Sequence, residues 1–353
     1  MTATKTVQVT RRKAGSHTIH DVAALAGVSS TTVSRYFNAP NLVSAGVRER
    51  LKEIIEHLGY VPSQVASGLA SGHGRVVCAA MQNIGSITFA DLVKGMTDEL
   101  QASGLQLLLA NVEFSQELEE KAIRTFIGWH PTALILTRED HTPATEAMLR
   151  KLKIPVVEAW GMDSTRPYHQ IGYPQAEAGA ILAKHFLDQG ARRIQFVLPN
   201  RPEDFRAKQR IDGFTREVQA AGIAADILIM PEQDDFDAGV ARIEAFSKEP
   251  VDTRPQALVF ANDNMGAGAI LHAPAVALTL PRDCAMASFG NASVSPHLRP
   301  ALTTLKPQRY YIGQQTARTV LDLLSRPKYE IEPIQKLIPC ELIVRDSSQL
   351  NLK

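Results

Sequence analysis

The sequence predicts an α/β protein with a small all-helical N-terminal segment, followed by a body of two doubly wound parallel sheets. Residues 18–58 carry apolar side chains at helical spacing, punctuated by glycine and proline. From residue 75 onward, short apolar runs alternate with amphipathic stretches, which is typical of parallel sheets covered by helices. The alternation restarts after a loop that precedes residue 176, so the body contains two such lobes.

Composition sets the broad class of the protein. The chain has 353 residues and a formal net charge of +1, with 44% apolar and 21% charged residues, as in ordinary soluble proteins. No apolar run is long enough for a transmembrane helix, and the N-terminus lacks the apolar stretch of a signal peptide. The three isolated cysteines fit a reducing compartment. We therefore expect a cytoplasmic protein with no membrane partner, no metal and no cofactor.

Charge is distributed unevenly along the chain. Residues 1–62 contain eight basic and four acidic side chains, a balance of +4, whereas the remaining 291 residues sum to −3. This asymmetry indicates an anion-binding module attached to a larger, slightly acidic body.

Two short helices separated by a glycine turn are predicted at the start of the N-terminal segment. Thr18 and Asp21 form a capping-box-like start for the first helix. Gly27 then allows a sharp turn, and Ser29 can cap a second helix over residues 30–37. This order is that of a helix-turn-helix motif.

The second helix exposes small or hydrogen-bonding side chains, namely Ser30, Thr31, Thr32, Ser34 and Arg35. A recognition helix needs such groups to reach base edges in the DNA major groove. A third helix is expected over residues 45–58, after Ser44 and before Gly59. The alternative is a three-helix bundle with a merely polar face, but the basic tail and the glycine turn together favour DNA binding.

The stretches TIHDVAALAGVSSTTVSRYFN (18–38) and VSAGVRERLKEIIEHLGYVPSQVASGLAS (43–71) resemble the lactose-repressor family of bacterial transcription regulators. The resemblance implies that the chain binds double-stranded operator DNA as a homodimer. It implies base reading by Ser30, Thr31 and Arg35. It places contacts at or near phosphates, which fix register and not sequence, at Thr18, Ser29, Ser34, Asn38 and Ser44.

The same resemblance implies a hinge helix over residues 63–74. In that family a leucine matching Leu69 wedges into the minor groove at the operator centre. The sequence departs from the family in two ways: Gly68 lowers helix propensity by about 1 kcal/mol relative to alanine, and Gln64 stands in a hinge that usually carries arginine. Free of DNA, we expect this segment to be a flexible linker.

The body is similar to a periplasmic-binding-protein-type effector domain. Its strands are expected over residues 76–81, 105–112, 133–137, 156–159, 194–198, 227–230, 257–260, 284–289 and 341–344. Its helices are expected over residues 89–102, 118–129, 144–152, 176–189, 205–221, 236–246, 265–271 and 311–324. A ligand is expected between the lobes, at the carboxyl ends of the strands.

The expected domain organisation follows. It comprises a basic flexible tail (1–17), a helix-turn-helix domain (18–62), a hinge (63–74), an effector-binding and dimerisation domain (75–346) and a tail (347–353). In that fold the chain crosses between the lobes three times. Lobe one is then expected to hold residues 75–172 and 305–334, and lobe two residues 173–304 and 335–346.

Effector-binding candidates lie at strand ends or match family positions. In lobe one they are Ile87, Thr88, Phe89, Thr137, Arg138, Glu158 and Trp160. In lobe two, Arg210 and Asn262 match residues that bind effector hydroxyls in several relatives. Asn291 lies just beyond a position where many relatives carry aspartate and where this chain has Gly290.

Four nearby residues have simpler interpretations. Asp263 is expected to cap a helix without touching ligand. Arg206 is expected to be a solvated charge, and His141 to be a loop residue or a ligand contact. Trp160 is either core or a wall on which a sugar stacks. Arg210 is the firmest candidate, because an arginine inside an amphipathic stretch needs an anionic or hydroxyl partner.

The stretch ALILTREDHTPATEAMLRKLKIPVVEAW (133–160) resembles the corresponding part of gluconate repressors. We therefore expect a repressor whose effector is gluconate or a ketogluconate. Its carboxylate would bind Arg138 or Arg210, and its hydroxyls would bind Thr88, Thr137 and Asn262. A neutral sugar or a purine effector stays open, as does a sugar-binding transport protein. The sequence offers no nucleophile elbow, paired carboxylates or His/Cys cluster, so we expect no catalytic residues.

Overall fold

The computed structural model describes residues 17–62, 74–85, 87–232, 234–326 and 332–350. The chain divides into two compact units, residues 1–74 and 75–353. The hinge segment, including Leu69, and the basic tail before residue 17 lie outside the described residues.

The first unit is a three-helix bundle. Its elements are α1 (Ile19–Ala26), α2 (Ser30–Asn38), the 3-10 turn η1 (Pro40–Leu42) and α3 (Ala45–Leu58). Thr18 and Asp21 form the predicted capping box, and the Ser29 hydroxyl accepts a hydrogen bond from the Thr32 amide at 3.2 Å. The bundle closes over a small apolar core of Val22, Ala23, Ala26, Val33 and Leu51.

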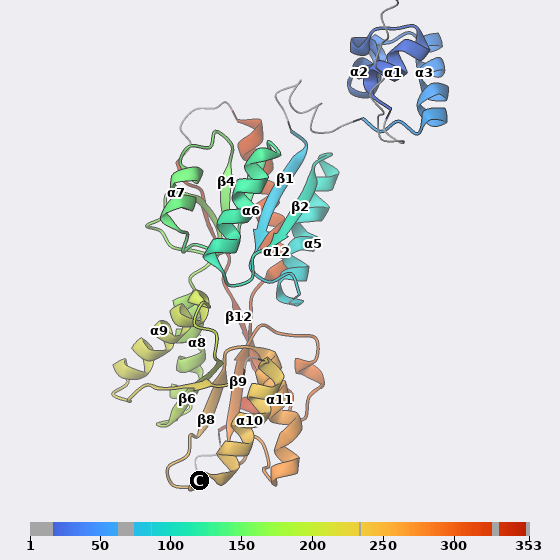
Figure 1. Cartoon of the computed structure of the whole chain (residues 1–353). Coiled ribbons are helices and arrows are strands. Elements are labelled where there is room, and N and C mark those ends of the chain that lie inside the picture. Colours follow the sequence, from blue (N-terminus) through green and yellow to red (C-terminus); the bar gives the residue numbers. More distant parts are fainter. Residues whose placement is uncertain (1–16, 63–73, 86, 233, 327–331, 351–353) are drawn as a thin grey trace, which may run out of the picture. The chain divides into compact units, whose positions relative to one another are not determined.

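The second unit contains two six-stranded sheets (Figure 1). All strands of the first sheet are parallel, and their order is β11-β5-β4-β3-β1-β2. These strands are β1 (Val76–Met81), β2 (Gln106–Asn111), β3 (Ala133–Leu136), β4 (Val156–Gly161), β5 (His169–Tyr173) and β11 (Gln335–Leu337). Its helices are α5 (Ile87–Ala102), α6 (Gln116–Gly128), α7 (Pro143–Leu149) and α12 (Arg309–Ser325).

Burial on both faces of this sheet explains the continuous apolar runs. Along β3, Ile135 packs into the core that includes Leu92 of α5, whereas Leu134 and Leu136 pack into the core that includes Phe126 of α6. A parallel sheet covered by helices on both faces needs apolar side chains at successive positions, as the sequence shows.

The second sheet has the order β12-β10-β9-β8-β6-β7, and β12 pairs antiparallel with β10. Its strands are β6 (Ile194–Pro199), β7 (Asp226–Met230), β8 (Ala257–Phe260), β9 (Ala285–Phe289), β10 (Thr303–Lys306) and β12 (Glu341–Ile343). Its helices are α8 (Gln175–Leu187), α9 (Phe205–Ala220), α10 (Asp235–Lys248) and α11 (Asp263–His272). Short 3-10 turns complete this lobe: η2 (Ala273–Val276), η3 (Ser295–His297) and η4 (Asp346–Ser348).

Helices α8 and α9 approach each other closely through two glycines. A Cβ atom added to Gly213 would stand 1.7 Å from the Ala176 carbonyl oxygen, and one added to Gly179 would stand 1.9 Å from the Arg210 carbonyl oxygen. The two backbones can therefore touch only because both positions lack a side chain, and this contact fixes where Arg210 stands.

The predicted fold class is confirmed, with corrections to the lobes. Three strands were missed, β5, β10 and β11. We expected residues 335–346 in lobe two, but β11 pairs with β5 of the first sheet, and only β12 joins the second. Residues 305 and 306, expected in lobe one, belong to β10 of the second sheet.

The predicted C-terminal tail is also partly wrong. Ser347 and Ser348 are buried, and the Ser348 hydroxyl lies 2.7 Å from the Thr303 hydroxyl and 2.8 Å from His185 Nε2. Within the described part of the chain, no helix is long and apolar enough to cross a membrane. The same residues contain no group of three or more His, Cys, Asp or Glu side chains that could hold a metal ion.

Candidate ligand cleft and nucleic-acid interface

Side chains that follow the carboxyl ends of strands bring the two lobes of the second unit into contact. Gln82 follows β1, and its side-chain oxygen accepts a hydrogen bond from Arg206 near the start of α9. Arg138 follows β3, and its guanidinium lies 5.1 Å from the ring centre of Phe205, the first residue of α9. In open parallel α/β sheets, ligands bind in the crevice beyond this edge.

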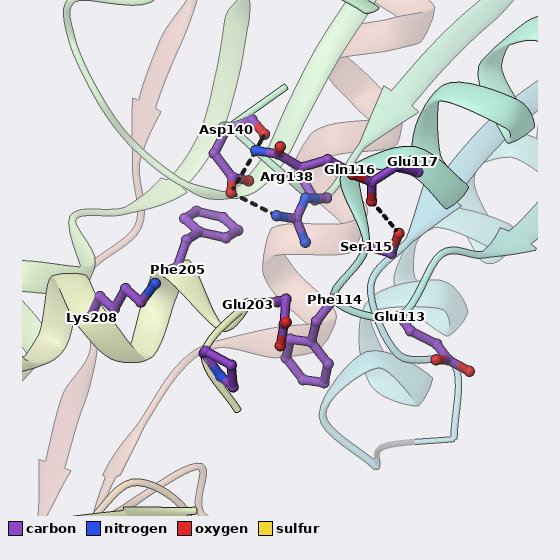
Figure 2. Close-up of a pocket in the computed structure, with 11 residues that line it drawn as sticks. Glu113, Phe114, Ser115, Gln116, Glu117, Arg138, Asp140, Glu203, Phe205 and Lys208 are labelled. Atoms are coloured by element: carbon purple, nitrogen blue, oxygen red, sulfur yellow. Dashed lines mark hydrogen bonds and ion pairs between the residues drawn. The ribbon is translucent and has the colours of Figure 1, made fainter. Parts of the chain in front are cut away.

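A cavity of about 570 Å³ opens between these segments (Figure 2). Lobe one contributes Phe114, Arg138 and Asp140 to its lining, and lobe two contributes Glu203, Phe205 and Lys208. The volume is that of a site for a small organic molecule.

Arg138 is the buried cation of this cavity. Its side chain is 1% exposed, and its Nη2 donates to Asp140 Oδ2 at 2.6 Å. Its Nε and Nη1 groups have no hydrogen-bond partner among the described residues. Figure 2 shows the guanidinium directed between Asp140 and Phe114. Two of its nitrogen donors are therefore buried without an acceptor in the described part of the protein.

Arg206 and Arg210, one turn apart on α9, are also buried arginines with unpaired N–H groups. Arg206 is 4% exposed and Arg210 6% exposed. Arg210 Nη1 donates to Gln175 Oε1 at 2.9 Å, and its guanidinium lies 4.6 Å from the ring centre of Phe289. Arg206 Nε and Nη2 and Arg210 Nε have no hydrogen-bond partner among the described residues, and neither arginine forms an ion pair within that set.

The prediction that Arg206 is a solvated charge is wrong, because Gln82 and the ring of Phe89 in lobe one and the ring of Phe205 in lobe two cover it. Burial lowers the pKa of Arg206 to about 10, so the side chain is still cationic at neutral pH. An unpaired buried charge is costly, and this arrangement fits an anionic ligand.

Aromatic rings line the contact between the lobes. Trp160 packs between Phe89 and Tyr173, with ring centres 5.5 and 5.8 Å away, and Tyr173 lies 6.3 Å from Phe289 of lobe two. Trp160 is 2% exposed, so it belongs to the core and also continues the wall beside the arginines. The Tyr173 hydroxyl is buried, and burial raises its pKa well above its usual value.

The outer face of α2 in the first unit carries two of the three predicted base-reading side chains and the predicted phosphate contact Asn38, whereas the third base-reading candidate, Ser30, is only partly exposed. Thr31, Arg35 and Asn38 are exposed at spacings of four and three residues, which places them on one side of the helix. The Asn38 side-chain amide donates to the Ser34 carbonyl oxygen at 3.1 Å. Arg35 forms no ion pair with any described residue, so its guanidinium is available.

The positive balance of residues 1–62 does not come from this bundle. Residues 17–62 contain four basic and four acidic side chains, so the whole excess of +4 lies in the preceding tail, on Lys5, Arg11, Arg12 and Lys13. The folded head therefore carries hydrogen-bonding groups and Arg35 on α2, whereas the excess positive charge lies in the residues that precede it.

Comparison with known proteins decides the family. Residues 18–63 match "Bacterial regulatory proteins, lacI family", and residues 183–348 match "Periplasmic binding protein-like domain". The chain belongs to the lacI family.

Full-length relatives agree with this assignment. The chain is 29% identical to catabolite control protein A of Priestia megaterium over 94% of this chain and 99% of that one. It is 27% identical to the HTH-type transcriptional regulator GntR of Pseudomonas aeruginosa over 96% and 97%. A crystal structure of a lacI-family transcriptional regulator from Silicibacter pomeroyi superposes with a TM-score of 0.85 at 28% identity, over 94% and 99%. The chain is therefore a DNA-binding transcriptional regulator and not an enzyme.

In this lacI-family regulator, two of the predicted effector residues are engaged inside lobe one. The Thr137 hydroxyl donates to the Ala80 carbonyl oxygen at 3.1 Å and accepts from the Gln82 amide at 2.9 Å. Both Glu158 oxygens accept hydrogen bonds from Arg166, at 2.6 to 2.9 Å. Thr137 ties the ends of β1 and β3 together, and Glu158 pairs with a half-buried arginine.

His141 is a loop residue, one of the two expected interpretations, and lies between β3 and α7. Its side chain is fully buried between two carboxylates, with Nδ1 2.6 Å from Glu119 Oε2 and Nε2 3.2 Å from Glu158 Oε1. Burial alone would lower its pKa, but hydrogen bonds and charge from the two glutamates raise the pKa of His141 to about 9. The imidazolium therefore fastens the segment that follows Arg138 to α6 and β4.

The predicted residues of lobe two have structural partners. Asn262 caps α11, and its Oδ1 accepts from the Met265 amide at 3.1 Å. The expectation that Asp263 is the cap is wrong, since Asp263 is the first helical residue and its carboxylate accepts from the hydroxyls of Ser295 and Thr304 at 2.7 and 2.6 Å.

The remaining candidates are placed as follows. The Asn291 side-chain oxygen accepts from Arg345 at 2.7 Å. Phe89 contributes its ring to the aromatic wall. Ile87 and Thr88 form the first turn of α5, and their side chains lie outside the described part of the structure. The predicted residues that the structure brings to the contact between the lobes are thus Phe89, Arg138, Trp160 and Arg210, together with Arg206, which was expected to be solvated.

Proposed function

We propose that this lacI-family regulator binds a sugar acid, such as gluconate or a ketogluconate, between its lobes and thereby changes its hold on operator DNA. The observation that carries this proposal is the set of three arginines, Arg138, Arg206 and Arg210, buried with unpaired N–H groups. Two carboxylate oxygens can accept two parallel hydrogen bonds from one guanidinium. The same carboxylate supplies the negative charge that buried guanidinium groups need.

A neutral sugar satisfies these requirements only in part. Its hydroxyls can accept hydrogen bonds from the free N–H groups. They cannot neutralise Arg206 or Arg210, neither of which has a carboxylate partner within 4 Å among the described residues. The unpaired Arg206 and Arg210 therefore favour an acid, with the hydroxyls of the sugar acid as secondary contacts.

The DNA-binding side of the proposal follows the family. Ser30, Thr31 and Arg35 read bases from the exposed face of α2, while Thr18, Ser29, Ser34, Asn38 and Ser44 lie at or near phosphates. Two copies of the chain bind adjacent half-sites as a homodimer, and Leu69 of each copy wedges into the minor groove. We further propose that the protein acts as a repressor in the bacterial cytoplasm, where operator DNA is found.

Effector binding and operator binding are coupled through the relative arrangement of the two lobes. An acid that binds more tightly in one arrangement of the lobes shifts the protein toward that arrangement, by no more than its difference in affinity for the two. By linkage, the operator must change the affinity for the acid by the same factor.

A thermal-shift panel of gluconate, 2-ketogluconate, glucose and adenine tests the effector class. A ligand at 100 times its Kd stabilises the folded state by about 2.7 kcal/mol. Wild-type protein should be stabilised by a sugar acid and not by glucose or adenine.

Two variants of α9 locate the site. Arg210→Met keeps an unbranched apolar stem over Phe289 but removes the guanidinium, so the stabilisation by acid should be lost. Arg216→Met, at an exposed arginine of the same helix, should keep it. Stabilisation of the wild type by glucose or adenine alone would refute the sugar-acid effector, and an equal response of both variants would refute the site.

A further inference from the structure

Glu139 is a buried carboxyl group at the edge of the same cleft. It follows Arg138 at the carboxyl end of β3 and is 7% exposed. Its Oε1 has no hydrogen-bond partner among the described residues. This is unusual, because a buried carboxylate is normally paired with a cation or saturated with hydrogen bonds.

The carboxyl group reaches this place because Gly161 has no side chain. A Cβ atom added to Gly161 at the end of β4 would stand 1.3 Å from Glu139 Oε1. Gly161 directly follows Trp160 of the aromatic wall, so the carboxyl group of Glu139 packs against backbone at the carboxyl edge of the first sheet.

Charged groups face Glu139 from both lobes. Arg206 of α9 attracts its negative charge from across the cleft, and Arg166 attracts it from the β4–β5 loop. Glu158 of β4 and Asp163 of the same loop oppose it. No ion pair to Glu139 forms within 4 Å among the described residues, so burial dominates and raises the pKa of Glu139 to about 7. At neutral pH this group is therefore balanced between its two protonation states.

We propose that Glu139 takes up the proton that accompanies an anionic effector into the cleft, and that it thereby makes the site selective for organic acids. This inference rests on the proposed function. A carboxylate that binds Arg206 brings a second negative charge close to Glu139 and competes for the same guanidinium, which disfavours the ionised form of Glu139. The protonated carboxyl group adds an O–H donor for an oxygen of the ligand. A neutral ligand brings no charge and draws in no proton.

The linkage fixes the sign and size of the effect. Suppose that Glu139 is protonated in the complex and has a pKa of about 7 in the free protein. The fraction of free protein in which Glu139 is protonated, and which can therefore bind the acid, then falls about tenfold between pH 6 and pH 8. Gluconate is fully ionised over this range, so its own titration does not contribute. Affinity for the acid should therefore fall about tenfold over these two pH units, with uptake of close to one proton at pH 8.

Isothermal titration calorimetry with gluconate, in buffers of different ionisation enthalpy, measures both quantities on the full chain. Wild-type protein should take up most of a proton at pH 8 and bind about tenfold more tightly at pH 6. Glu139→Gln, which mimics the protonated group, should bind with no proton uptake and with one affinity at both pH values. Asp212→Asn, at an exposed acid of α9, should behave like wild type.

The outcomes separate the two proposals. Binding of gluconate to the wild type without proton uptake, or proton uptake that persists in Glu139→Gln, overturns the role of Glu139 and leaves the sugar-acid site standing. Absence of gluconate and 2-ketogluconate binding to the wild type overturns both. If Glu139→Gln does not fold, the pH dependence and proton count of the wild type decide alone.

Discussion

Replacement of His141 by asparagine should destabilise lobe one, because it removes the cation between two buried glutamates. The imidazole is fully buried, with Glu119 Oε2 2.6 Å from Nδ1 and Glu158 Oε1 3.2 Å from Nε2. Asparagine cannot carry positive charge, so Glu119 would lose its cationic partner and Glu158 would keep only Arg166.

The size of the expected destabilisation follows from the shift in the pKa of His141. A rise in the pKa of His141 from 6.5 to about 9 corresponds to about 3 kcal/mol of the free energy of unfolding, at 1.36 kcal/mol per pH unit. The folded-state pKa lies above the unfolded one, so this stabilisation is fully present below pH 6.5 and is lost as the pH rises through 9. Removal of one partner from a buried ionic pair typically costs about 3–5 kcal/mol, which agrees with the value of about 3 kcal/mol obtained from the pKa of His141.

Urea unfolding followed by tryptophan fluorescence reports on this lobe, because the two tryptophans of the chain, Trp129 and Trp160, both belong to it. At pH 6, His141→Asn should lose about 3 kcal/mol or more relative to wild type, and the difference should shrink by pH 9.5. His130→Asn, at an exposed position with φ of 50° that asparagine tolerates, should match wild type. Equal stability of His141→Asn and wild type at pH 6, or a difference that grows with pH, would refute the ion-pair interpretation.

Three further outcomes are expected. Operator affinity should fall steeply between 50 and 200 mM salt whereas effector affinity should barely change, and equal salt slopes would contradict separate sites. In an operator-binding titration, Arg35→Ala should cost about 1–3 kcal/mol and relax sequence preference; a uniform loss on all sequences would assign Arg35 to phosphate. In thermal unfolding, Gly213→Ala should destabilise by about 1–3 kcal/mol because its Cβ meets the Ala176 carbonyl, whereas Gly46→Ala, with open space around it, should be neutral or stabilising.

The sequence predicted those parts of the fold whose signals are local. The capping box at Thr18 and the apolar strands of both lobes carry their information within a few residues. Strand β11 (Gln335–Leu337) was missed because its three side chains are exposed and show no apolar pattern. It is a strand only because β5 offers it a free edge more than 160 residues earlier in the chain.

The site was harder to predict for the same reason. Arg206 lies in a polar stretch between Glu203 and Lys208 that has the composition of a solvent-exposed loop. Its burial comes from Gln82, 124 positions away, and from the ring of Phe89. Arg210 could be predicted because it matched a family position, which already encodes that long-range contact.

The central claim is that an organic acid held by the buried arginines controls DNA binding. Fluorescence anisotropy of a labelled operator duplex, selected from random-sequence DNA and titrated with and without gluconate, tests it most directly. Gluconate should change the operator affinity of the wild type by about 5-fold to 150-fold. It should have no effect on Arg210→Met, which should still bind the duplex. An operator affinity that gluconate leaves unchanged in the wild type, or changes equally in Arg210→Met, would contradict the account.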